Sequence, residues 1–450
     1  MSEIIVAGAG HGGVTAAMFL ADEGHSVTVY EKEAEGSVGL DQKDFLDASA
    51  LEYAGIEIPE KFRAPGNAIT FVPLEDDVDS VTLPAPPDYE NLSVNRREFI
   101  SYLISLARDR GVKFVYGTGI KGPVMLGSRV AGVETEDGEK IYADLVIDSA
   151  GVHSPLRKNL PDFLGVDKEP AYYDILHTYR ACFNRLPGVQ APGTPYNIYV
   201  REDGTEGFRW AITEKDRVDV LLARFPEMDY SDVAQGLFAV SEFNPHMDRD
   251  ITHGGHFADI PVRQPSAVLV ADGYAMVGDS AFMTYPVKGS GMAYAIRAGR
   301  MLADAVLDDT DGLFNAETLW EYQKTFFKEI GFSASRLAVI KAILPYMTAS
   351  EINEIFKRGL VSSEELSLLS SGNMPMAKIL SAVREKLKIM GDIPEFKGHM
   401  GDIIGWMGRL ASIEATFPSK YSSESIQKWA VKYNRFFDSI RKPEENAIQA

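Results

Sequence analysis

The sequence contains a single cysteine, Cys182, among its 450 residues, and this scarcity excludes several kinds of site. One thiol cannot build an intrachain disulfide framework, a zinc cluster ligated by cysteines or an iron–sulfur cluster. We therefore expect a reducing, cytoplasmic location, with Cys182 as a small buried hydrophobe. No metal site is expected, because His253 and His256 lie in a glycine loop without a paired acid and are expected to be loop hydrogen-bonders.

The chain also lacks an excess of basic residues. Its 45 Lys and Arg stand against 65 Asp and Glu, which gives a formal charge of −20. This balance argues against nucleic acid and against a polybasic membrane anchor, since both require clustered Lys and Arg. No run approaches the ~20 apolar residues of a bilayer span, and no secretory signal is expected. Peripheral membrane contact stays open: the apolar segment 334–348 is expected to pack in the core, with a lid or a membrane-touching surface as the alternative.

The first thirty residues have the order strand, glycine turn, helix, strand. Strands are expected at residues 4–7 and 26–30, with GAGHGG and a helix at residues 14–23 between them. The right-handed crossover of such a βαβ unit places its two strands parallel in one sheet.

The glycines of this turn and the acid that follows predict an adenine dinucleotide site. Gly8 permits the tight turn, Gly10 lets the backbone approach a pyrophosphate, and Gly13 lets the helix pack closely on the strand. The helix N-terminus offers free N–H groups to the phosphates. Glu31, at the end of the second strand, is placed to accept hydrogen bonds from ribose hydroxyls. A structural glycine turn is the alternative.

Hydrophobic patterns along the rest of the chain predict three parts. A helix at residues 96–110, a strand at 113–116 and a hairpin around Asp137-Gly138 continue the first part, and a buried strand at 267–277 followed by a helix to 305 returns to it. Alternating segments are expected at residues 175–183, 196–200, 208–212 and 217–225, and helices from about 316 to 441. We therefore expect an α/β fold: a discontinuous domain with a parallel sheet (1–165 and 266–305), an inserted antiparallel β-rich domain (166–265 with part of 61–95) and an α-helical C-terminal region (306–450).

Two further motifs follow expected buried strands. The first is the sequence DSAGVHSPLR, which contains Gly151, and the second is GDSA with Asp279, followed by Pro286, Gly289 and Gly291. A carboxylate at Asp279 can hold a polyol hydroxyl of a cofactor, or it can act as a helix N-cap. A helix that opens near Gly291 can point N–H groups at a carbonyl of a cofactor ring.

These three motifs, in this order, resemble the flavoprotein superfamily that includes the p-hydroxybenzoate hydroxylases, geranylgeranyl reductases and flavin-dependent halogenases. The resemblance covers roughly residues 1–305 and implies a Rossmann-type FAD-binding domain with an inserted substrate domain. It also implies that Arg96 lies near the FAD, although Arg96 or Arg97 can instead be a solvated residue at a helix start. The cofactor contacts it implies are Gly8, Gly10, His11, Gly12, Gly13, Glu31, Lys32, Arg96, Gly151, Asp279, Pro286, Gly289, Gly291 and Met292.

Within that superfamily the sequence is more similar to the geranylgeranyl reductases than to the hydroxylases. GSGMAYAIRAG resembles the reductase pattern G-x-G-I-x-x-A-M-x-S-G, whereas Ala293 and Ala150 stand where hydroxylases carry Asn and Asp. GFRWAIT resembles the signature G-Y-x-W-x-F-P, with Thr213 in place of the proline. Trp210 in this stretch is a candidate for the substrate site, with core packing as the alternative.

The resemblance implies an oxidoreductase that reduces a carbon–carbon double bond of an apolar substrate by hydride transfer from reduced FAD. Tyr285, Trp210 and Lys288 are candidate catalytic residues, although Tyr285 can equally pack and Lys288 can be solvated. No second glycine motif marks a stable NAD(P)H domain, so electrons are expected from transiently bound NAD(P)H, a ferredoxin or another flavoprotein. The alternatives are an NAD(P)H-dependent monooxygenase and a flavoprotein dehydrogenase that passes electrons to a quinone.

Overall fold

The computed structural model describes residues 1–65, 68–73, 79–84, 90–190, 194–200, 207–244, 246–359, 375–390 and 392–441. Its first layer is a six-stranded sheet with the order β18-β19-β12-β1-β2-β8. All neighbouring pairs are parallel except β18 with β19. The strands are β1 (Glu3–Ala7), β2 (Ser26–Glu31), β8 (Lys113–Tyr116), β12 (Leu145–Asp148), β18 (Val270–Ala271) and β19 (Tyr274–Met276).

Two three-stranded sheets adjoin this layer, with the orders β11-β10-β9 and β3-β7-β4. Their strands are β3 (Lys43–Asp47), β4 (Arg63–Pro65), β7 (Glu90–Asn95), β9 (Ile120–Leu126), β10 (Arg129–Thr135) and β11 (Lys140–Tyr142). The predicted turn at Gly138 connects β10 and β11, and its φ of 84° is one that glycine adopts without strain.

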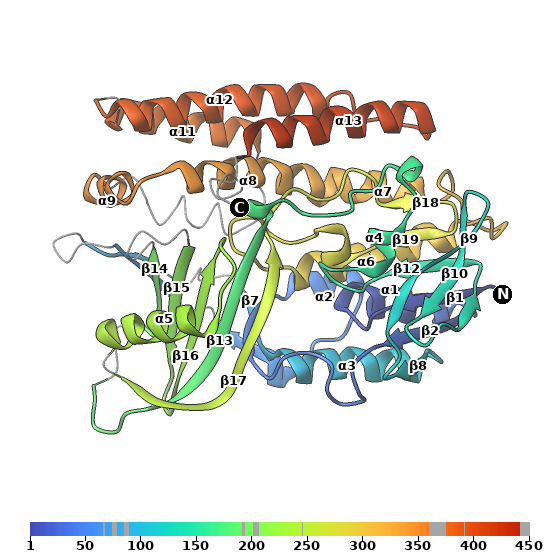
Figure 1. The fold of residues 1–450 in the computed structure, drawn as a ribbon, viewed down its shortest axis with the longest axis horizontal. Helices are drawn as coiled ribbons and strands as arrows, with labels where there is room; N and C mark the ends of the chain where they lie inside the picture. The colour runs from blue at the N-terminus through green and yellow to red at the C-terminus, as the bar shows by residue number, and fades with distance from the viewer. Residues whose placement is uncertain are drawn as a thin grey trace.

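The fourth sheet has seven strands in the order β17-β13-β16-β15-β14-β5-β6. These are β5 (Ile69–Val72), β6 (Val81–Leu83), β13 (Ile175–Arg185), β14 (Tyr196–Val200), β15 (Gly207–Thr213), β16 (Arg217–Arg224) and β17 (Met247–Pro261). Because side chains alternate along a strand, this sheet has two distinct faces. The outer face is covered by α5 (Tyr230–Phe243), which lies on the far side of the sheet from α2 (Ser49–Ala54) and α3 (Arg96–Asp109) in Figure 1.

The opposite face, which we call the inner face, carries Arg180, Cys182, Trp210, Ile212, Asp219 and Leu221. Phe45 of β3 packs against its apolar cluster. Gly289, which precedes α6 (Met292–Leu307), also approaches this side: a Cβ there would lie 3.2 Å from a methyl group of Ile260 in β17. The inner face therefore looks toward the part of the molecule that carries the glycine motifs.

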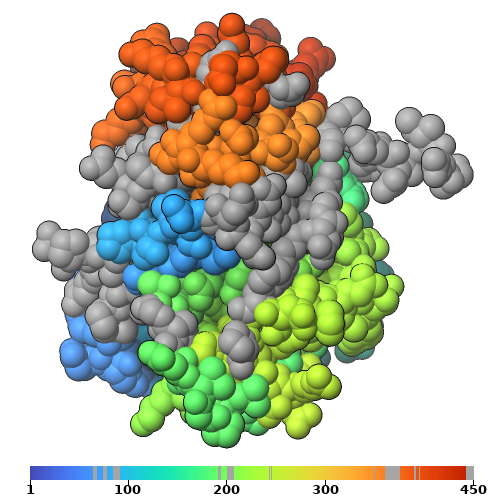
Figure 2. Space-filling model, turned by 90° about the vertical axis from the view of Figure 1, so that its left-hand side faces the viewer, coloured from blue at the N-terminus to red at the C-terminus, as the bar shows by residue number. Residues whose placement is uncertain are grey.

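The remaining helices cover the parallel sheet and form the C-terminal region. They are α1 (His11–Asp22), α2 (Ser49–Ala54), α3 (Arg96–Asp109), α4 (Pro155–Asn159), α6 (Met292–Leu307), α7 (Trp320–Phe326), α8 (Phe332–Ile343), α9 (Ala349–Lys357), α11 (Met376–Met390), α12 (Pro394–Glu414) and α13 (Ser423–Ile440). Short helical turns are η1 (Glu60–Phe62), η2 (Asp162–Leu164), η3 (Tyr172–Asp174), η4 (Gly278–Ala281), the π-helical η5 (Phe327–Gly331) and η6 (Leu344–Tyr346). In Figure 2 the C-terminal helices form the top of the molecule and the seven-stranded sheet with α5 the bottom.

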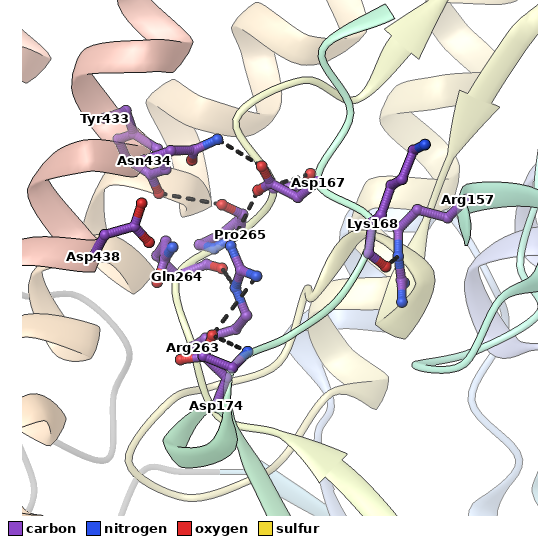
Figure 3. Close-up of polar contacts among 12 residues, drawn as sticks. Arg157, Asp167, Lys168, Asp174, Arg263, Gln264, Pro265, Tyr433, Asn434 and Asp438 are labelled. Carbon is purple, nitrogen blue, oxygen red and sulfur yellow. Dashed lines mark hydrogen bonds and ion pairs between the residues drawn. The ribbon is translucent and has the colours of Figure 1, made fainter. Parts of the chain in front are cut away.

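Polar contacts attach the last helix to the body of the protein (Figure 3). Asp167 accepts hydrogen bonds from Asn434 of α13 at 2.6 Å and from Arg263 at 3.0 Å. Tyr433 donates to the carbonyl of Pro265 at 3.3 Å. Arg441, at the end of α13, forms an ion pair with buried Asp174 at 2.9 Å, so the C-terminal region is tied to the start of β13.

Several sequence predictions differ from the structure in their bounds. Helix α1 begins at His11 and not at residue 14, because the carbonyl of Gly10 already accepts a hydrogen bond from the amide of Val14. The strand expected at 267–277 is interrupted, since Gly273 has a φ of 71° and turns β18 back along β19. Helix α5 (Tyr230–Phe243) lies inside the β-rich region, where the sequence patterns predict no helix.

The expectation of a loop around His253 and His256 was wrong, because both residues belong to β17. The two glycines between them have φ of 84° and 77°, and they produce a bulge where the register with β13 shifts. Within the described part of the chain, no group of three or more His, Cys, Asp and Glu residues could hold a metal ion.

The apolar segment 334–348 packs mainly into the core, where Ala334, Leu337 and Val339 are fully buried, while Leu344 is 41% exposed. Among the described helices, none is by itself both long and apolar enough to cross a membrane. One pair bent by 117°, residues 320–346 with 350–357, meets the length and composition test only when taken together.

Candidate flavin and substrate site

The glycine turn between β1 and α1 is packed against the residue that follows β12. A Cβ on Gly8, Gly10 or Gly13 would lie 2.5 Å from an atom of Ser149. The Ser149 hydroxyl accepts a hydrogen bond from the amide of Gly13 at 3.2 Å. The turn therefore needs glycine for contact with its own protein, and sequence reasoning missed Ser149 because nothing in its neighbourhood marks it as the partner of a turn 136 residues away.

Gly12 serves a different contact, between α1 and α6. A Cβ on Gly12 would lie 2.8 Å from the carbonyl oxygen of Ala295, and one on Gly299 would lie 2.3 Å from the carbonyl oxygen of Gly12. The two helices therefore cross with their backbones nearly touching. This crossing brings the start of α1 close to the first turns of α6, so the first and third glycine motifs meet in space.

Glu31 closes the same turn from the end of β2. Its carboxylate accepts hydrogen bonds from the amide of Ala9 at 2.7 Å and from the amide of Glu33 at 2.8 Å, one on each oxygen. A carboxylate oxygen has two lone pairs, so each oxygen keeps acceptor capacity for a ribose hydroxyl. Lys32, the next residue, is exposed.

His11 is the first residue of α1, and its ring stacks on Phe99 of α3 with the centroids 5.7 Å apart. Burial, with a smaller contribution from the charge of Arg96, lowers the pKa of His11 to about 3. The imidazole is therefore neutral at physiological pH. Among the described residues its buried Nε2 has no hydrogen-bond partner, and a bound polar group could supply one.

Arg96 connects α3 to the other candidate residues. Its amide donates to the carbonyl of Gln42 at 2.8 Å, and its guanidinium lies 3.5 Å from a carboxylate oxygen of Asp44. Its positive charge also contributes to the pKa values of His11 and Asp279, so the structure brings α1, α3 and η4 together around it.

Asp279 lies in η4, and its carboxylate accepts a hydrogen bond from the hydroxyl of Thr284 at 3.0 Å. Burial raises the pKa of this carboxyl, while Thr284 and Arg96 act in the opposite direction. The alternative that Asp279 is a helix N-cap does not fit, because neither η4 nor α6 has a side-chain cap. Its oxygen also lies 3.0 Å from the place of a Cβ on Gly291, so Gly291 is the residue that allows α6 to begin beside it.

A closed loop precedes α6 and carries the two candidate catalytic residues Tyr285 and Lys288. The amide of Tyr285 donates to the carbonyl of Ser290 at 2.9 Å, and the amide of Gly289 donates back to the carbonyl of Tyr285 at 2.8 Å. Pro286 is buried, and Met292 is the first residue of α6. The ammonium of Lys288 lies 5.4 Å from the centre of the Tyr285 ring, and partial loss of surrounding water lowers its pKa to about 8. Lys288 as a whole is nevertheless an exposed residue, in keeping with the solvated alternative.

The third candidate, Trp210, lies apart from this loop on the inner face. It is 8% exposed, and its ring lies 5.5 Å from that of Tyr196 and 4.7 Å from the guanidinium of Arg180. Cys182 is buried on the same face, and burial raises the pKa of its thiol to about 12. In this position Trp210 can pack in the sheet core, and it can also lie beside a substrate.

The residues present fit a dinucleotide cofactor at the meeting point of these motifs. The buried His11 nitrogen without a partner and the free acceptor capacity of Glu31 both favour a polar ligand there. Gly151, with a φ of 82°, has no atom within 4 Å of the place of a Cβ, so the space beside the second motif is open.

Comparison with known proteins also supports a dinucleotide cofactor. Residues 88–305 match a family described as FAD dependent oxidoreductase, and residues 6–41 match an NAD(P)-binding Rossmann-like domain. A digeranylgeranylglycerophospholipid reductase of Sulfolobus acidocaldarius is 22% identical over 383 residues, which cover 81% of this chain and 82% of the relative. A reductase of the same name from Haloferax volcanii is 23% identical over 425 residues, which cover 86% and 96%.

A solved structure shows the same fold. It is a geranylgeranyl bacteriochlorophyll reductase-like protein of Thermoplasma acidophilum, with a TM-score of 0.71 and 18% sequence identity. The match covers 88% of this chain and 99% of that one. The predicted α/β class, with a Rossmann-type parallel sheet, further antiparallel sheets and C-terminal helices, is thereby confirmed.

Proposed function

Because this chain is an FAD-dependent oxidoreductase that resembles the geranylgeranyl reductase family, we propose that it reduces carbon–carbon double bonds in the isoprenoid chains of a lipid. FAD would be held by the glycine turn at residues 8–13, by Glu31 and Arg96, and by Asp279 with the loop at residues 286–292. Gly151 would leave room for it, and His11 would offer its unpartnered nitrogen.

The observation that carries this proposal is the apolar character of the inner face next to those residues. Its cluster joins side chains from three strands of the seven-stranded sheet with Phe45 of β3: Tyr196, Ile198, Phe208, Trp210, Ile212, Leu221 and Ala223. Because Trp210, Ile212 and Leu221 are only 6–8% exposed, a hydrocarbon chain would bind along the edge of this cluster. It would be stabilised by about 25 cal/mol per Å² of apolar area removed from water, whereas a polar aromatic substrate would gain little.

The residues of this chain would orient the reactants and supply charge and a proton. Bound FAD, once reduced, supplies the hydride. The N-terminus of α6 at Met292 carries a partial positive charge that favours an anionic ring beside it. With its pKa near 8, the Nζ of Lys288 carries a proton at neutral pH, so Lys288 is our candidate proton donor, with Tyr285 beside it.

The partners and the location follow from this chemistry. The electron donor is proposed to be NAD(P)H, bound transiently, or a ferredoxin-type protein. Since the substrate would be a lipid, the enzyme would contact a membrane surface peripherally. We place it on the cytoplasmic side, because a chain with a single thiol and no disulfide framework fits a reducing compartment.

Anaerobic single turnover tests the proposal. The protein is purified with FAD, reduced with dithionite and mixed with geranylgeranyl compounds that differ only in the number of double bonds. We expect flavin reoxidation with the unsaturated compounds and none with the saturated analogue. Reoxidation only after air is admitted, with an oxygenated product, would instead establish the monooxygenase alternative, and reoxidation by a quinone alone would establish the dehydrogenase.

A further inference from the structure

The inner face contains a buried ion pair at the border of its apolar cluster, with Asp44 and His256 as polar neighbours of Arg180. The side chains of Arg180 and Asp219 are only 8% and 5% exposed. Their contact is bidentate, with the guanidinium Nε 3.0 Å and Nη2 2.6 Å from the two carboxylate oxygens. The immediate neighbours across the strands are Leu221 and Ile212, and Trp210 lies next to them.

A pair in this position is not explained by the stability of the fold. Removing two charges from water costs about as much as their attraction returns, and exchange of such a pair for apolar residues of similar volume is often neutral or stabilising. The pair borders an apolar cluster of the same face, so two apolar side chains in its place would have apolar neighbours in Leu221 and Ile212. The pair fixes the orientation of the Arg180 guanidinium, because its bidentate contact with Asp219 holds the guanidinium plane in place.

That fixed guanidinium contacts two other parts of the molecule. It lies over the ring of Trp210, 4.7 Å from its centre, and it donates a hydrogen bond to the carbonyl oxygen of Lys43 in β3. The carbonyl of Arg180 in turn accepts a hydrogen bond from the side-chain amide of Gln42 at 3.4 Å. Since Gln42 accepts from the amide of Arg96, these contacts run from the sheet to the residues proposed to hold FAD.

We propose that Arg180, held by Asp219, is a positioning residue that fixes the Trp210 ring and the β3 strand relative to the flavin and so determines how tightly the isoprenoid chain binds. This inference rests on the proposed function, because it assigns the inner face to the substrate. It adds a specificity-determining pair to that site, acting through Trp210 and not by contact with the reacting carbons.

The test exchanges the pair for apolar residues, so that no buried charge remains. Arg180→Met with Asp219→Leu is compared with the natural protein for thermal stability, FAD content and single-turnover reoxidation over a range of geranylgeranyl substrate concentrations. We expect FAD content and stability to be retained, while the half-saturating substrate concentration rises about tenfold, in line with the worth of a desolvated cation–π contact. The limiting rate at saturation should fall less.

A matched control uses a second bidentate Arg–Asp pair on the same sheet. Arg224 of β16 contacts both carboxylate oxygens of Asp232 in α5, on the outer face. Arg224→Met with Asp232→Asn, in which the amide oxygen preserves an acceptor for the helix start, should leave the half-saturating concentration unchanged.

The outcomes separate the inference from the proposed function. If the natural protein reoxidises with no unsaturated lipid, the proposed function fails. If the natural protein is reoxidised by an unsaturated lipid and the Arg180→Met, Asp219→Leu protein behaves identically, the pair is structural and the inference is overturned. A shift of equal size in the outer-face control would also overturn it, because the effect would then not belong to the inner face. If the double variant lost its FAD or failed to fold, the pair would be needed for the fold, which contradicts the argument from burial.

Discussion

Replacement of Gly10 by alanine distinguishes two reasons why the first motif requires glycine. The backbone at Gly10 has φ −69° and ψ 157°, which any residue adopts, so an alanine causes no strain in the chain itself. Its Cβ, however, would lie 2.5 Å from the hydroxyl oxygen of Ser149 and 3.0 Å from the Ser149 carbonyl oxygen. The side chain of Ser149 must therefore turn away, and its hydrogen bond from Gly13 is then lost.

The cost follows from these two contacts. Inserting a methyl group into a closely packed site costs about 1–3 kcal/mol, and the lost hydrogen bond costs about 1 kcal/mol more. We therefore expect Gly10→Ala to lower the free energy of unfolding of the FAD-free protein by about 2–4 kcal/mol. Urea unfolding of the FAD-free protein measures this value, and quenching of flavin fluorescence measures FAD affinity in parallel.

Ser149→Ala supplies the control, because it removes the hydroxyl oxygen that the new methyl group would meet. Combined with Gly10→Ala, it should restore most of the lost stability, so the double-mutant cycle shows a strong coupling between the two positions. If Gly10→Ala leaves the FAD-free protein as stable as the natural one and weakens only FAD binding, the steric argument is wrong. The close approach of a pyrophosphate would then be the reason for the glycine.

Three further predictions concern other parts of the chain. Burial lowers the pKa of His11 from 6.5 to about 3, so below pH 6.5 the unfolded chain binds a proton that the folded chain does not. His11 should therefore make the FAD-free protein about 2 kcal/mol less stable at pH 5 than at pH 7, and urea unfolding of His11→Gln should show a smaller loss. Gly299→Ala should lower the melting temperature, since its Cβ would lie 2.3 Å from a backbone oxygen of α1, whereas Gly401→Ala in α12, with no atom within 4 Å, should raise it. Arg441→Met should cost about 2 kcal/mol, measured by denaturant unfolding, because buried Asp174 loses the Arg441 ion pair but keeps Arg263 at 3.7 Å. An unchanged midpoint would show that the C-terminal helix is not held at this point.

Local sequence patterns predicted the fold class well, because strands, helices and their order depend mainly on hydrophobic periodicity and on glycine positions. The helix that follows Arg96 and the hairpin at Gly138 lie where the patterns indicated. The sequence patterns failed to predict secondary structure where packing between distant segments determines it. The turn at Gly273 interrupts an apolar run that reads as one strand, and α5 forms on the outer face of the sheet although its surroundings are β-structure.

The candidate site shows the same division. Glu31 and Asp279 could be named from their place after buried strands, and the structure shows what each contacts within the protein. Their long-range partners could not be named. Ser149 meets a turn more than a hundred residues away, and Asp219 pairs with Arg180 only because β13 and β16 lie side by side in antiparallel register. Such partners depend on strand order, which a single sequence does not reveal.

The mass of the product after anaerobic turnover tests the central claim most directly. The FAD-loaded protein, reduced with dithionite, is incubated without oxygen with a lipid that carries geranylgeranyl chains, and the lipid is analysed by mass spectrometry. The account predicts a product that has gained two hydrogen atoms for each double bond reduced, in an amount that matches the flavin reoxidised. An unchanged lipid, or a product that has gained oxygen once air is admitted, would contradict it.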